Sequence, residues 1–237
     1  MQSCGWAFAV GTYVFQLRSA RYSDARSSAN SSKFQILTYS RTIPNLLIDY
    51  GMTILVLPYL LPCIAILWLV LKASAPRSNA FFVQTRYGLG GKPFKMYKFR
   101  TMVPEAEEIK AALIELSEDK GPGFKIENDP RVTRIGRLLR KSYLDELPQF
   151  FNVLKGEMAL VGPRANSFEP THYEPWQLGR LAVLPGITGT WQIAKSKPKD
   201  FKLRCQMDID YIKNKTVLGD LSILLKTALV CVQRSGT

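Results

Sequence analysis

The sequence predicts a mainly helical α+β fold, in which one kinked, reentrant membrane helix precedes a small globular domain with a short β-hairpin. Three observations predict this fold class. Residues 50–71 contain no charged side chain, two strand-like segments flank a glycine-rich turn within residues 81–99, and most of the remaining sequence has helical periodicity. We therefore divide the chain into an N-terminal arm (1–43), a membrane helix (44–75) and a globular domain (76–237).

The N-terminal arm is expected to be flexible, because residues 18–33 are rich in serine and in basic side chains. The apolar stretch at residues 5–17 is too short to span a bilayer and lacks a basic leader. We therefore expect neither a membrane span nor a signal peptide in this arm.

The membrane helix is predicted because an apolar run of about 20 residues suffices to cross a bilayer. Pro58 and Pro62 lie inside the run and should kink it, since proline removes a backbone donor and clashes with the preceding turn. Both flanks are basic, and positive charge favours the cytoplasmic side of a membrane. A bent helix that enters and leaves on the cytoplasmic face satisfies both flanks, whereas a simple span remains the alternative.

The globular domain should contain several further elements. Residues 81–99 predict two strands around the glycines, and residues 102–119 and 145–156 predict helices, the second ended by Gly156. Residues 216–234 predict a helix whose long apolar face packs on the core or lies in the membrane interface. Residues 129–142 predict an amphipathic helix with Arg134, Arg137 and Lys141 on one face and Ile135, Leu138 and Leu139 on the other.

Composition narrows the classes of partner. The formal net charge of +13 implies a polyanion: nucleic acid, an anionic membrane surface or a phosphorylated substrate. The four cysteines are scattered without a CxxC pair, which favours a reducing, cytosol-facing domain over a zinc or disulfide framework. His172 is the only histidine, so Ser-His-Asp and HExxH mechanisms are not expected.

Two adjacent acids, Asp145 and Glu146, are the first candidates for chemistry. If a helix begins near residue 145, its dipole should keep Asp145 ionised, and Arg140 and Lys141 should act in the same direction. An ionised aspartate can attack phosphorus, while the neighbouring glutamate holds a divalent cation such as Mg²⁺. The structural alternative is that Asp145 caps the helix and that the charge of Glu146 only interacts favourably with the helix dipole.

Two cations complete this set of candidates. Arg164 follows Gly162 and Pro163 in a turn, and its planar guanidinium suits bidentate recognition of phosphate. Lys98 lies in a strand, on the side opposite to Phe99. Each of these signals is weak when taken alone.

The motifs together are more specific. The strings "FKMYKFRTM", "DPRVTRIGRLLRKSYLDELPQFFNVLKGEMALVGPR", "LPGITGTWQ", "DIDYIKN" and "DLSILLKTA" occur in this order. They closely resemble the bacterial sugar transferase family, the monotopic polyprenyl-phosphate phosphoglycosyltransferases. The resemblance extends from about residue 44 to residue 237 and leaves out only the N-terminal arm.

This resemblance implies a reentrant helix in the bacterial inner membrane, with a cytoplasmic catalytic domain at the inner leaflet. The family transfers a sugar-1-phosphate from a UDP-sugar to undecaprenyl phosphate and releases UMP, as the first step of exopolysaccharide assembly. By this likeness Asp145 is the nucleophile and Glu146 holds Mg²⁺. Arg140, Arg164 and Lys98 match phosphate-binding positions, and Asp208 matches a further acidic site residue.

The chain departs from the family pattern at several places. Leu61-Pro62 stands where the family often has Ser-Pro, and Pro163-Arg164-Ala165 replaces the usual Pro-Arg-Pro. The loop at residues 192–201 lacks the usual Gly-Arg. The second change is expected to loosen the turn behind Arg164, and the third leaves the identity of the sugar open.

Two other functions fit part of the sequence. A non-catalytic, membrane-anchored basic protein would bind a polyanion, but no nucleic-acid motif and no stacking aromatics accompany the bases, so nucleic acid is not an expected partner. An aspartate-based phosphohydrolase would release product without a lipid acceptor. A homodimer is left open.

Overall fold

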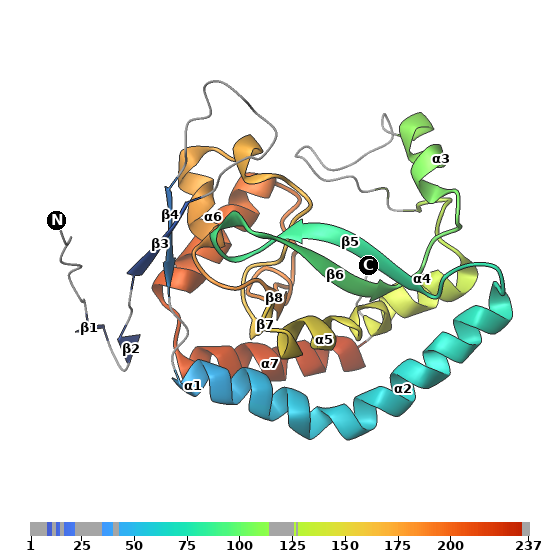
Figure 1. Cartoon of the computed structure of the whole chain (residues 1–237), viewed down its shortest axis with the longest axis horizontal. Helices are drawn as coiled ribbons and strands as arrows, with labels where there is room; N and C mark the ends of the chain where they lie inside the picture. Colours follow the sequence, from blue (N-terminus) through green and yellow to red (C-terminus); the bar gives the residue numbers. More distant parts are fainter. Residues whose placement is uncertain are drawn as a thin grey trace.

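The computed structural model of the chain describes residues 9–10, 13–14, 17–21, 35–39, 43–113, 126 and 128–233 (Figure 1). The described part of the N-terminal arm forms two antiparallel strand pairs. These are β1 (Ala9–Val10) with β2 (Tyr13–Val14), and β3 (Leu17–Arg21) with β4 (Gln35–Tyr39). Residues 18–21, expected within a linker, therefore belong to β3, and the rest of that linker lies outside the described residues. The three-part division of the chain and the flexible arm stay predictions.

One long apolar helix runs along the domain. It consists of α1 (Ile43–Leu46), a π-helical turn (Leu47–Gly51) and α2 (Met52–Ser74). The combined helix, Ile43–Ser74, is long and apolar enough to cross a membrane. Both Pro58 and Pro62 lie inside α2, and Figure 1 shows the helix bent near its middle. The membrane-embedded, reentrant placement of this helix stays a prediction.

Both ends of this helix make hydrogen bonds to residues outside it. Near its start, the buried Asp49 side chain accepts a hydrogen bond of 2.8 Å from the Leu160 backbone N–H. At its end, Lys72 Nζ donates to the Pro76 and Ser78 carbonyl oxygens, just before the first strand of the hairpin. Between them, one stripe of α2 is buried against the domain (Leu60, Ile64 and Leu71), and much of the rest is exposed.

The predicted hairpin is confirmed. Strands β5 (Phe81–Tyr87) and β6 (Pro93–Phe99) pair in antiparallel fashion across a turn in which Gly90 and Gly91 have φ values of 63° and 76°. Such positive φ values favour glycine. In this register Phe82 lies opposite Lys98, and Arg86 lies opposite Phe94. Directly opposed residues of an antiparallel pair share a face, so Arg86 and Lys98 project from the same side of the hairpin.

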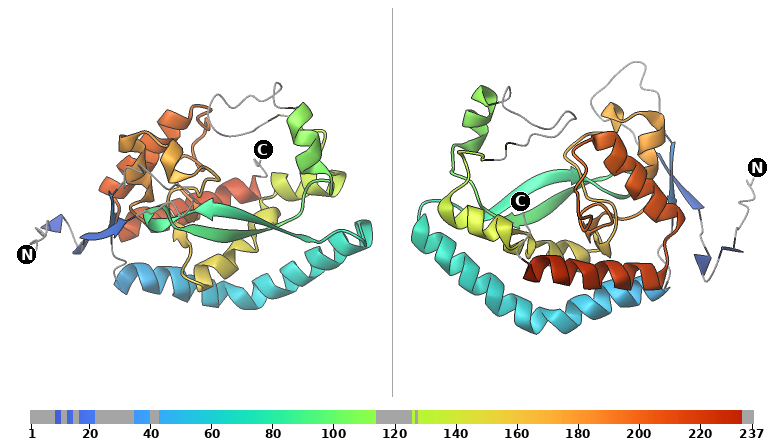
Figure 2. Two further views of the ribbon diagram at one scale, coloured as in Figure 1. Left: turned by 45° about the horizontal axis from the view of Figure 1, so that its top comes forward. Right: turned by 180° about the vertical axis from the view of Figure 1, so that it is seen from behind.

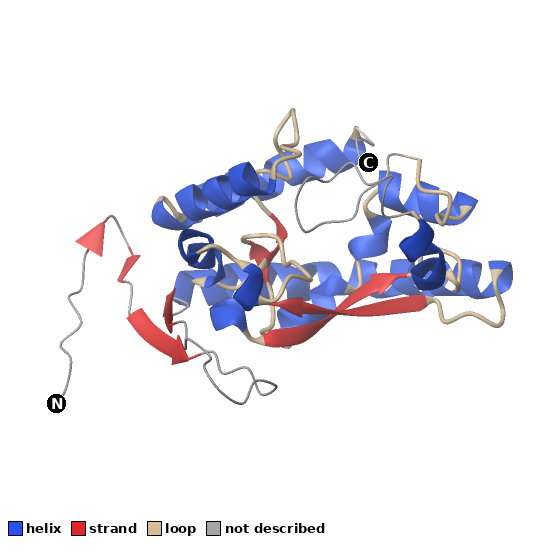
Figure 3. Ribbon diagram, turned by 90° about the horizontal axis from the view of Figure 1, so that it is seen from above, coloured by secondary structure: helices blue, strands red, loops and turns tan. Residues whose placement is uncertain are grey.

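The remaining elements make the fold mainly helical (Figure 3). A second, parallel pair of strands lies near the middle of the domain: β7 (Ala159–Val161) and β8 (Gly186–Thr188). Figure 2 shows that α5 and α7 lie on the side of the domain that faces α1 and α2. Among the described residues of the globular domain, the α-helices are α3 (Ala106–Ala112), α4 (Arg134–Lys141), α5 (Gln149–Leu154), α6 (Phe201–Lys213) and α7 (Val217–Val232).

Two helices have shorter bounds than the sequence predicts, and a third matches its prediction. Helix α3 covers only part of the predicted 102–119, of which residues 114–119 lie outside the described residues. The predicted helix 145–156 is shorter, because α5 begins at Gln149, although it does end before Gly156 (φ 74°) as expected. Helix α7 matches residues 216–234 closely, with Thr216 as its N-cap.

The apolar face predicted for residues 129–142 is wrong at Leu138, which is 62% exposed. Ile135 and Leu139 pack on the core as expected. The buried face is rotated toward Gly136, where a Cβ atom would lie 2.0 Å from the Thr101 carbonyl oxygen. Because successive helical residues point about 100° apart, this close approach turns Leu138 away from the core.

The central core cluster holds the strands β7 and β8 in place. It includes Met96 of β6, Val153 of α5, Leu160 of β7 and Ile223 of α7, all buried. The two strands approach so closely that a Cβ atom on Gly186 would lie 2.1 Å from the Gly162 nitrogen. The turn that follows β7 is therefore fixed against β8, and it carries Arg164.

Candidate active site

The two adjacent acids lie in a tight 3-10 turn, Leu144–Glu146, between α4 and α5. Tyr143 precedes the turn in the left-handed region (φ 57°, ψ 12°), an uncommon conformation for a residue other than glycine. Leu144 and Leu147 pack beneath the turn on the cluster that contains Phe99 and Leu139. This apolar anchoring holds the two carboxylates at fixed positions, where both are only 9% exposed.

Glu146 is held by two cations from distant parts of the chain. Lys98 Nζ of β6 lies 2.8 Å from Glu146 Oε1. Arg164, in the turn after β7, donates through Nη1 to Oε2 at 3.2 Å and through Nη2 to Oε1. The structure thus brings together three residues that the sequence analysis selected separately.

The two neighbouring carboxyl groups have opposite pKa displacements. Burial disfavours the charged form of Glu146, but Arg164 and Lys98 outweigh it and hold the pKa of Glu146 well below its usual range. Burial raises the pKa of Asp145 to about 6. The positive charge of Lys98 opposes this rise, whereas the negative charge of Glu146 adds to it. Asp145 accepts no hydrogen bond from the described residues.

The expectation that a helix dipole and Lys141 keep the pKa of Asp145 low is wrong. Asp145 lies in the 3-10 turn and not at the start of an α-helix, and Lys141 is exposed. The helix-cap alternative is not supported either, because Pro148 occupies the N-cap position of α5 and makes no side-chain cap hydrogen bond. Burial, which the local sequence does not reveal, sets the direction of the pKa displacement.

Arg140 borders this turn at the end of α4. Its Nε donates to Thr101 Oγ1 at 2.9 Å, and its charge couples to that of Asp145. Burial lowers the pKa of Arg140, with Asp145 and Asp129 opposing. Arg140, Lys98 and Arg164 therefore gather around the two acids as predicted, while their role as phosphate-binding groups stays a prediction.

Asp208 of α6 is not part of this group. It forms a buried ion pair of 2.6 Å with Arg180, and both side chains are at most 2% exposed. Arg180 Nη2 also donates to the Arg164 carbonyl oxygen at 2.9 Å, so Arg180 links Asp208 to the site. Burial raises the pKa of Asp208 to about 6, with Arg180 opposing.

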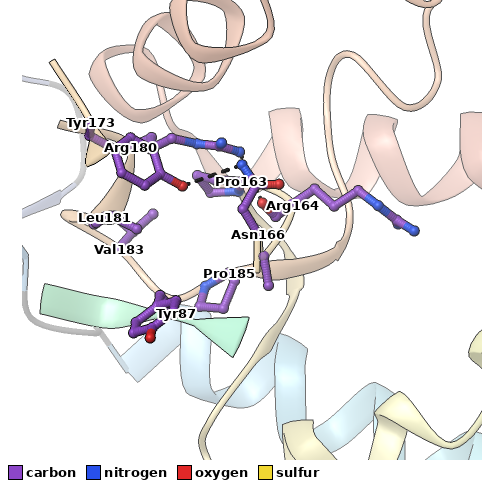
Figure 4. Close-up of a pocket in the computed structure, with 11 residues that line it drawn as sticks. Tyr87, Pro163, Arg164, Asn166, Tyr173, Arg180, Leu181, Val183 and Pro185 are labelled. Atoms are coloured by element: carbon purple, nitrogen blue, oxygen red, sulfur yellow. Dashed lines mark hydrogen bonds between the residues drawn. The ribbon is translucent and has the colours of Figure 1, made fainter. Parts of the chain in front are cut away.

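The turn behind Arg164 is better supported than its missing second proline suggested. Arg180 contacts the Arg164 carbonyl, and Arg86 Nη1 lies 3.4 Å from the Ala165 carbonyl oxygen. Figure 4 shows Arg180 and Tyr173 together on one side of this turn, with the Arg164 side chain extending away from them. The cavity lined by Arg164, Tyr173 and Arg180 has a volume of only about 10 Å³, roughly the space of one water molecule.

Sequence reasoning missed Arg86 and Arg180. Arg86 lies on the same face of the hairpin as Lys98, so the period of the strands could have revealed it. Burial lowers the pKa of Arg86 to about 10, and the neighbouring positive charge of Arg164 acts in the same direction. No local pattern marks Arg180, which the fold brings to the site by pairing it with Asp208.

Comparisons with known proteins agree with the motifs. The chain is 41% identical over 175 residues to the galactosyl transferase CpsE of Streptococcus agalactiae serotype III, covering 73% of this chain and 39% of that protein. It is 40% identical over 197 residues to the undecaprenyl-phosphate galactose phosphotransferase of Salmonella typhimurium, covering 79% and 40%. It is also 37% identical over 164 residues to the exopolysaccharide production protein ExoY of Rhizobium meliloti, covering 67% and 73%.

The chain thus spans about two fifths of the length of the first two relatives and a larger share of the third. The family model described as bacterial sugar transferase matches residues 39–234, which include the long apolar helix, the hairpin and the two acids. The predicted resemblance is confirmed, and the chain belongs to the bacterial sugar transferase family.

Proposed function

We propose that the chain transfers a sugar-1-phosphate from a UDP-sugar to undecaprenyl phosphate through a covalent intermediate on Asp145. The observation that carries this proposal is the different environment of the two acids. Glu146 is clamped by Lys98 and Arg164, whereas Asp145 accepts no hydrogen bond from the described residues. A carboxylate without donors on it is the better nucleophile, and the adjacent cations are available to a substrate phosphate.

The substrate classes come from the names of relatives. One relative, from Salmonella typhimurium, is an undecaprenyl-phosphate galactose phosphotransferase, and another, from Escherichia coli K12, is a UDP-glucose:undecaprenyl-phosphate glucose-1-phosphate transferase. The relatives differ in the sugar, so the choice of sugar is left open for this chain. A role in exopolysaccharide assembly follows the name of the Rhizobium meliloti relative.

The proposed reaction has two balanced steps. In the first, an Asp145 carboxylate oxygen bonds to the sugar-linked phosphorus, the phosphoanhydride bond breaks, and UMP leaves with the bonding electrons. In the second, an oxygen of undecaprenyl phosphate attacks the same phosphorus and releases the Asp145 carboxylate. Lys98, Arg140 and Arg164 would stabilise the charge on the phosphate oxygens in both steps. With its pKa at about 6, Asp145 is mostly ionised at pH 7, as the first step requires.

The residues present fit a magnesium ion at Glu146. The described residues hold no group of three or more metal-ligating acids, cysteines or histidines, and Mg²⁺ is commonly held by one or two carboxylates plus substrate phosphate oxygens. Glu146 stays ionised, and its hydrogen bonds leave acceptor capacity on Oε2. When bound there, the ion would supply positive charge to the phosphate oxygens.

The proposed membrane placement is a reentrant helix with the catalytic domain in the cytoplasm. Support comes from the bend in α2, from the contact of Asp49 with Leu160, and from the packing of Leu71 in the cluster with Phe99 and Leu139, which hold both ends of the helix against the domain. Four leucines of α7 are exposed at helical spacing, which suits a helix at the lipid surface: Leu218, Leu221, Leu225 and Leu229. A homodimer stays a prediction.

A UMP-release assay tests the proposed function. The purified chain is incubated with a panel of UDP-sugars and Mg²⁺, with and without undecaprenyl phosphate. The proposal predicts sustained turnover only when the lipid is present. Steady turnover without lipid would instead indicate a phosphohydrolase, and no release under either condition would favour a non-catalytic protein that binds a polyanion.

A further inference from the structure

Arg86 is a cation that the proposed chemistry leaves without a role. It projects from β5 on the same face of the hairpin as Lys98, and it is partly buried. Its Nη2 donates to Gln84 Oε1 at 2.6 Å, and its Nη1 makes only a long contact of 3.4 Å to the Ala165 carbonyl oxygen. Its Nε is buried and has no hydrogen-bond partner among the described residues.

A second guanidinium lies next to Arg86. Ala165 directly follows Arg164, so the contact to its carbonyl brings Arg86 close to Arg164, and the charges of the two arginines repel one another. Placing two like charges together in a desolvated site is unfavourable unless an anion compensates them. Glu146 compensates part of this charge, but it is already shared by Lys98 and Arg164.

The net charge of the whole site also favours an anionic ligand. Four cationic side chains (Arg86, Lys98, Arg140 and Arg164) surround two carboxylates, Asp145 and Glu146, which leaves a surplus of positive charge. The diphosphate of a nucleotide sugar carries one negative charge on each phosphate. This surplus attracts a diphosphate, which is long enough to reach more than one of the cations.

The position of Arg86 indicates which phosphate it meets. The charge of Asp145 acts on Lys98, Arg140 and Arg164, the three cations that the proposed function assigns to the attacked phosphate. Arg86 couples instead to Arg164 and Glu146. Arg86 lies next to Arg164 through its contact with the Ala165 carbonyl oxygen, so it is the neighbouring cation left for the second phosphate of the diphosphate.

We propose that Arg86 binds the phosphate of the nucleotide sugar that departs with the nucleoside, with its unpaired Nε–H among the donors. This inference rests on the proposed function, since it assumes that Asp145 attacks the sugar-linked phosphate. Charge-assisted hydrogen bonds to phosphate are stronger than neutral ones, so Arg86 would both bind the nucleotide and stabilise the leaving group.

The alternative is that Arg86 only supports the turn through the Ala165 carbonyl. Two substitutions separate the roles. Arg86→Gln keeps an amide donor for that carbonyl but removes the charge, whereas Arg86→Lys keeps the charge. Lys95→Ala is the matched control, because Lys95 is an exposed cation on the same hairpin whose Nζ contacts Thr85.

Calorimetric titration with UMP, at fixed Mg²⁺ and on the full chain in detergent, measures the effect directly. We expect Arg86→Gln to weaken UMP binding by roughly tenfold or more, which corresponds to about 1.4 kcal/mol. Arg86→Lys should lose less, and Lys95→Ala should bind like the wild type. The role in phosphate binding would be overturned if Arg86→Gln bound UMP as tightly as the wild type does, or if it bound UMP more tightly than Arg86→Lys does.

A second measurement needs no substitution. Phenylglyoxal modifies arginines, and peptide mass spectrometry can follow the modification of Arg86 in the wild type with and without UMP. Protection of Arg86 by UMP is expected, and an unchanged rate would overturn the inference. If the wild type binds no UMP and releases none from any UDP-sugar, the proposed function itself fails, which is a different result from loss at Arg86 alone.

Discussion

Replacing Asp145 with asparagine should abolish the proposed nucleophile and yet stabilise the folded protein. Burial raises the pKa of Asp145 from 3.8 to about 6, so the charged carboxylate is less favourable in the folded chain than in the unfolded one. Each unit of pKa corresponds to about 1.36 kcal/mol, which gives a cost of about 3 kcal/mol at pH 7. Asparagine has nearly the same shape and carries no charge, so the variant avoids this cost.

The sign of the pH dependence follows from the same displacement. Between pH 3.8 and about 6 the folded state binds more protons at Asp145 than the unfolded state does, so wild-type stability falls as pH rises through this window. Asparagine does not titrate. The advantage of Asp145→Asn should therefore be largest at pH 7 and should vanish near pH 4.

Chemical denaturation of wild type and Asp145→Asn in detergent, at pH 4 and pH 7, measures both free energies of unfolding. Glu105→Gln is a matched control, since Glu105 is an exposed acid away from the site. We expect a gain of up to about 3 kcal/mol at pH 7 for Asp145→Asn only. A variant that is equally stable or less stable than the wild type at pH 7 would refute the reasoning that burial strains this carboxylate.

Three further predictions concern the metal, the buried ion pair and the membrane helix. Glu146→Gln should lower turnover and weaken the dependence on Mg²⁺, because a neutral amide is a poorer ligand for a hard cation; undiminished turnover in this variant or in chelator would count against the magnesium site. Arg180→Met should destabilise the fold by about 3–5 kcal/mol, because it leaves Asp208 buried without its partner and removes the donor to the Arg164 carbonyl oxygen, and a variant that melts like the wild type would show that the pair is dispensable. Cysteines placed at the exposed Ile43 and Arg77, in a background without native cysteines, should both be labelled from the cytoplasm, whereas labelling of the two from opposite sides would exclude a reentrant helix.

Local sequence patterns predicted the secondary structure well where one type of residue determines the local conformation. The glycines at 90 and 91 occupy the positive φ values that close the hairpin, and the charge-free run became one long apolar helix. The prediction at Leu138 was wrong because the close contact of Gly136 with Thr101 rotates α4, and no periodicity within the helix records that contact.

Those site residues that belong to recognisable sequence motifs could be predicted. Asp145, Glu146, Lys98 and Arg164 were all selected from sequence, and the fold brings them together. The direction of the Asp145 pKa displacement was not predictable, because nearby charges are visible in a sequence and burial is not. Arg180 was missed for a similar reason, since its contacts with Asp208 and the Arg164 carbonyl exist only in the folded chain.

The most direct test of the central claim is to look for the covalent intermediate on Asp145. Intact-protein mass spectrometry, after incubation with a UDP-sugar and Mg²⁺ but no lipid, should show the added mass of a sugar phosphate. Peptide mapping should place this adduct on Asp145, and undecaprenyl phosphate should remove it. Asp145→Ala should form no adduct and should lose turnover by orders of magnitude. An adduct on another residue, or near-normal turnover in Asp145→Ala, would contradict the account.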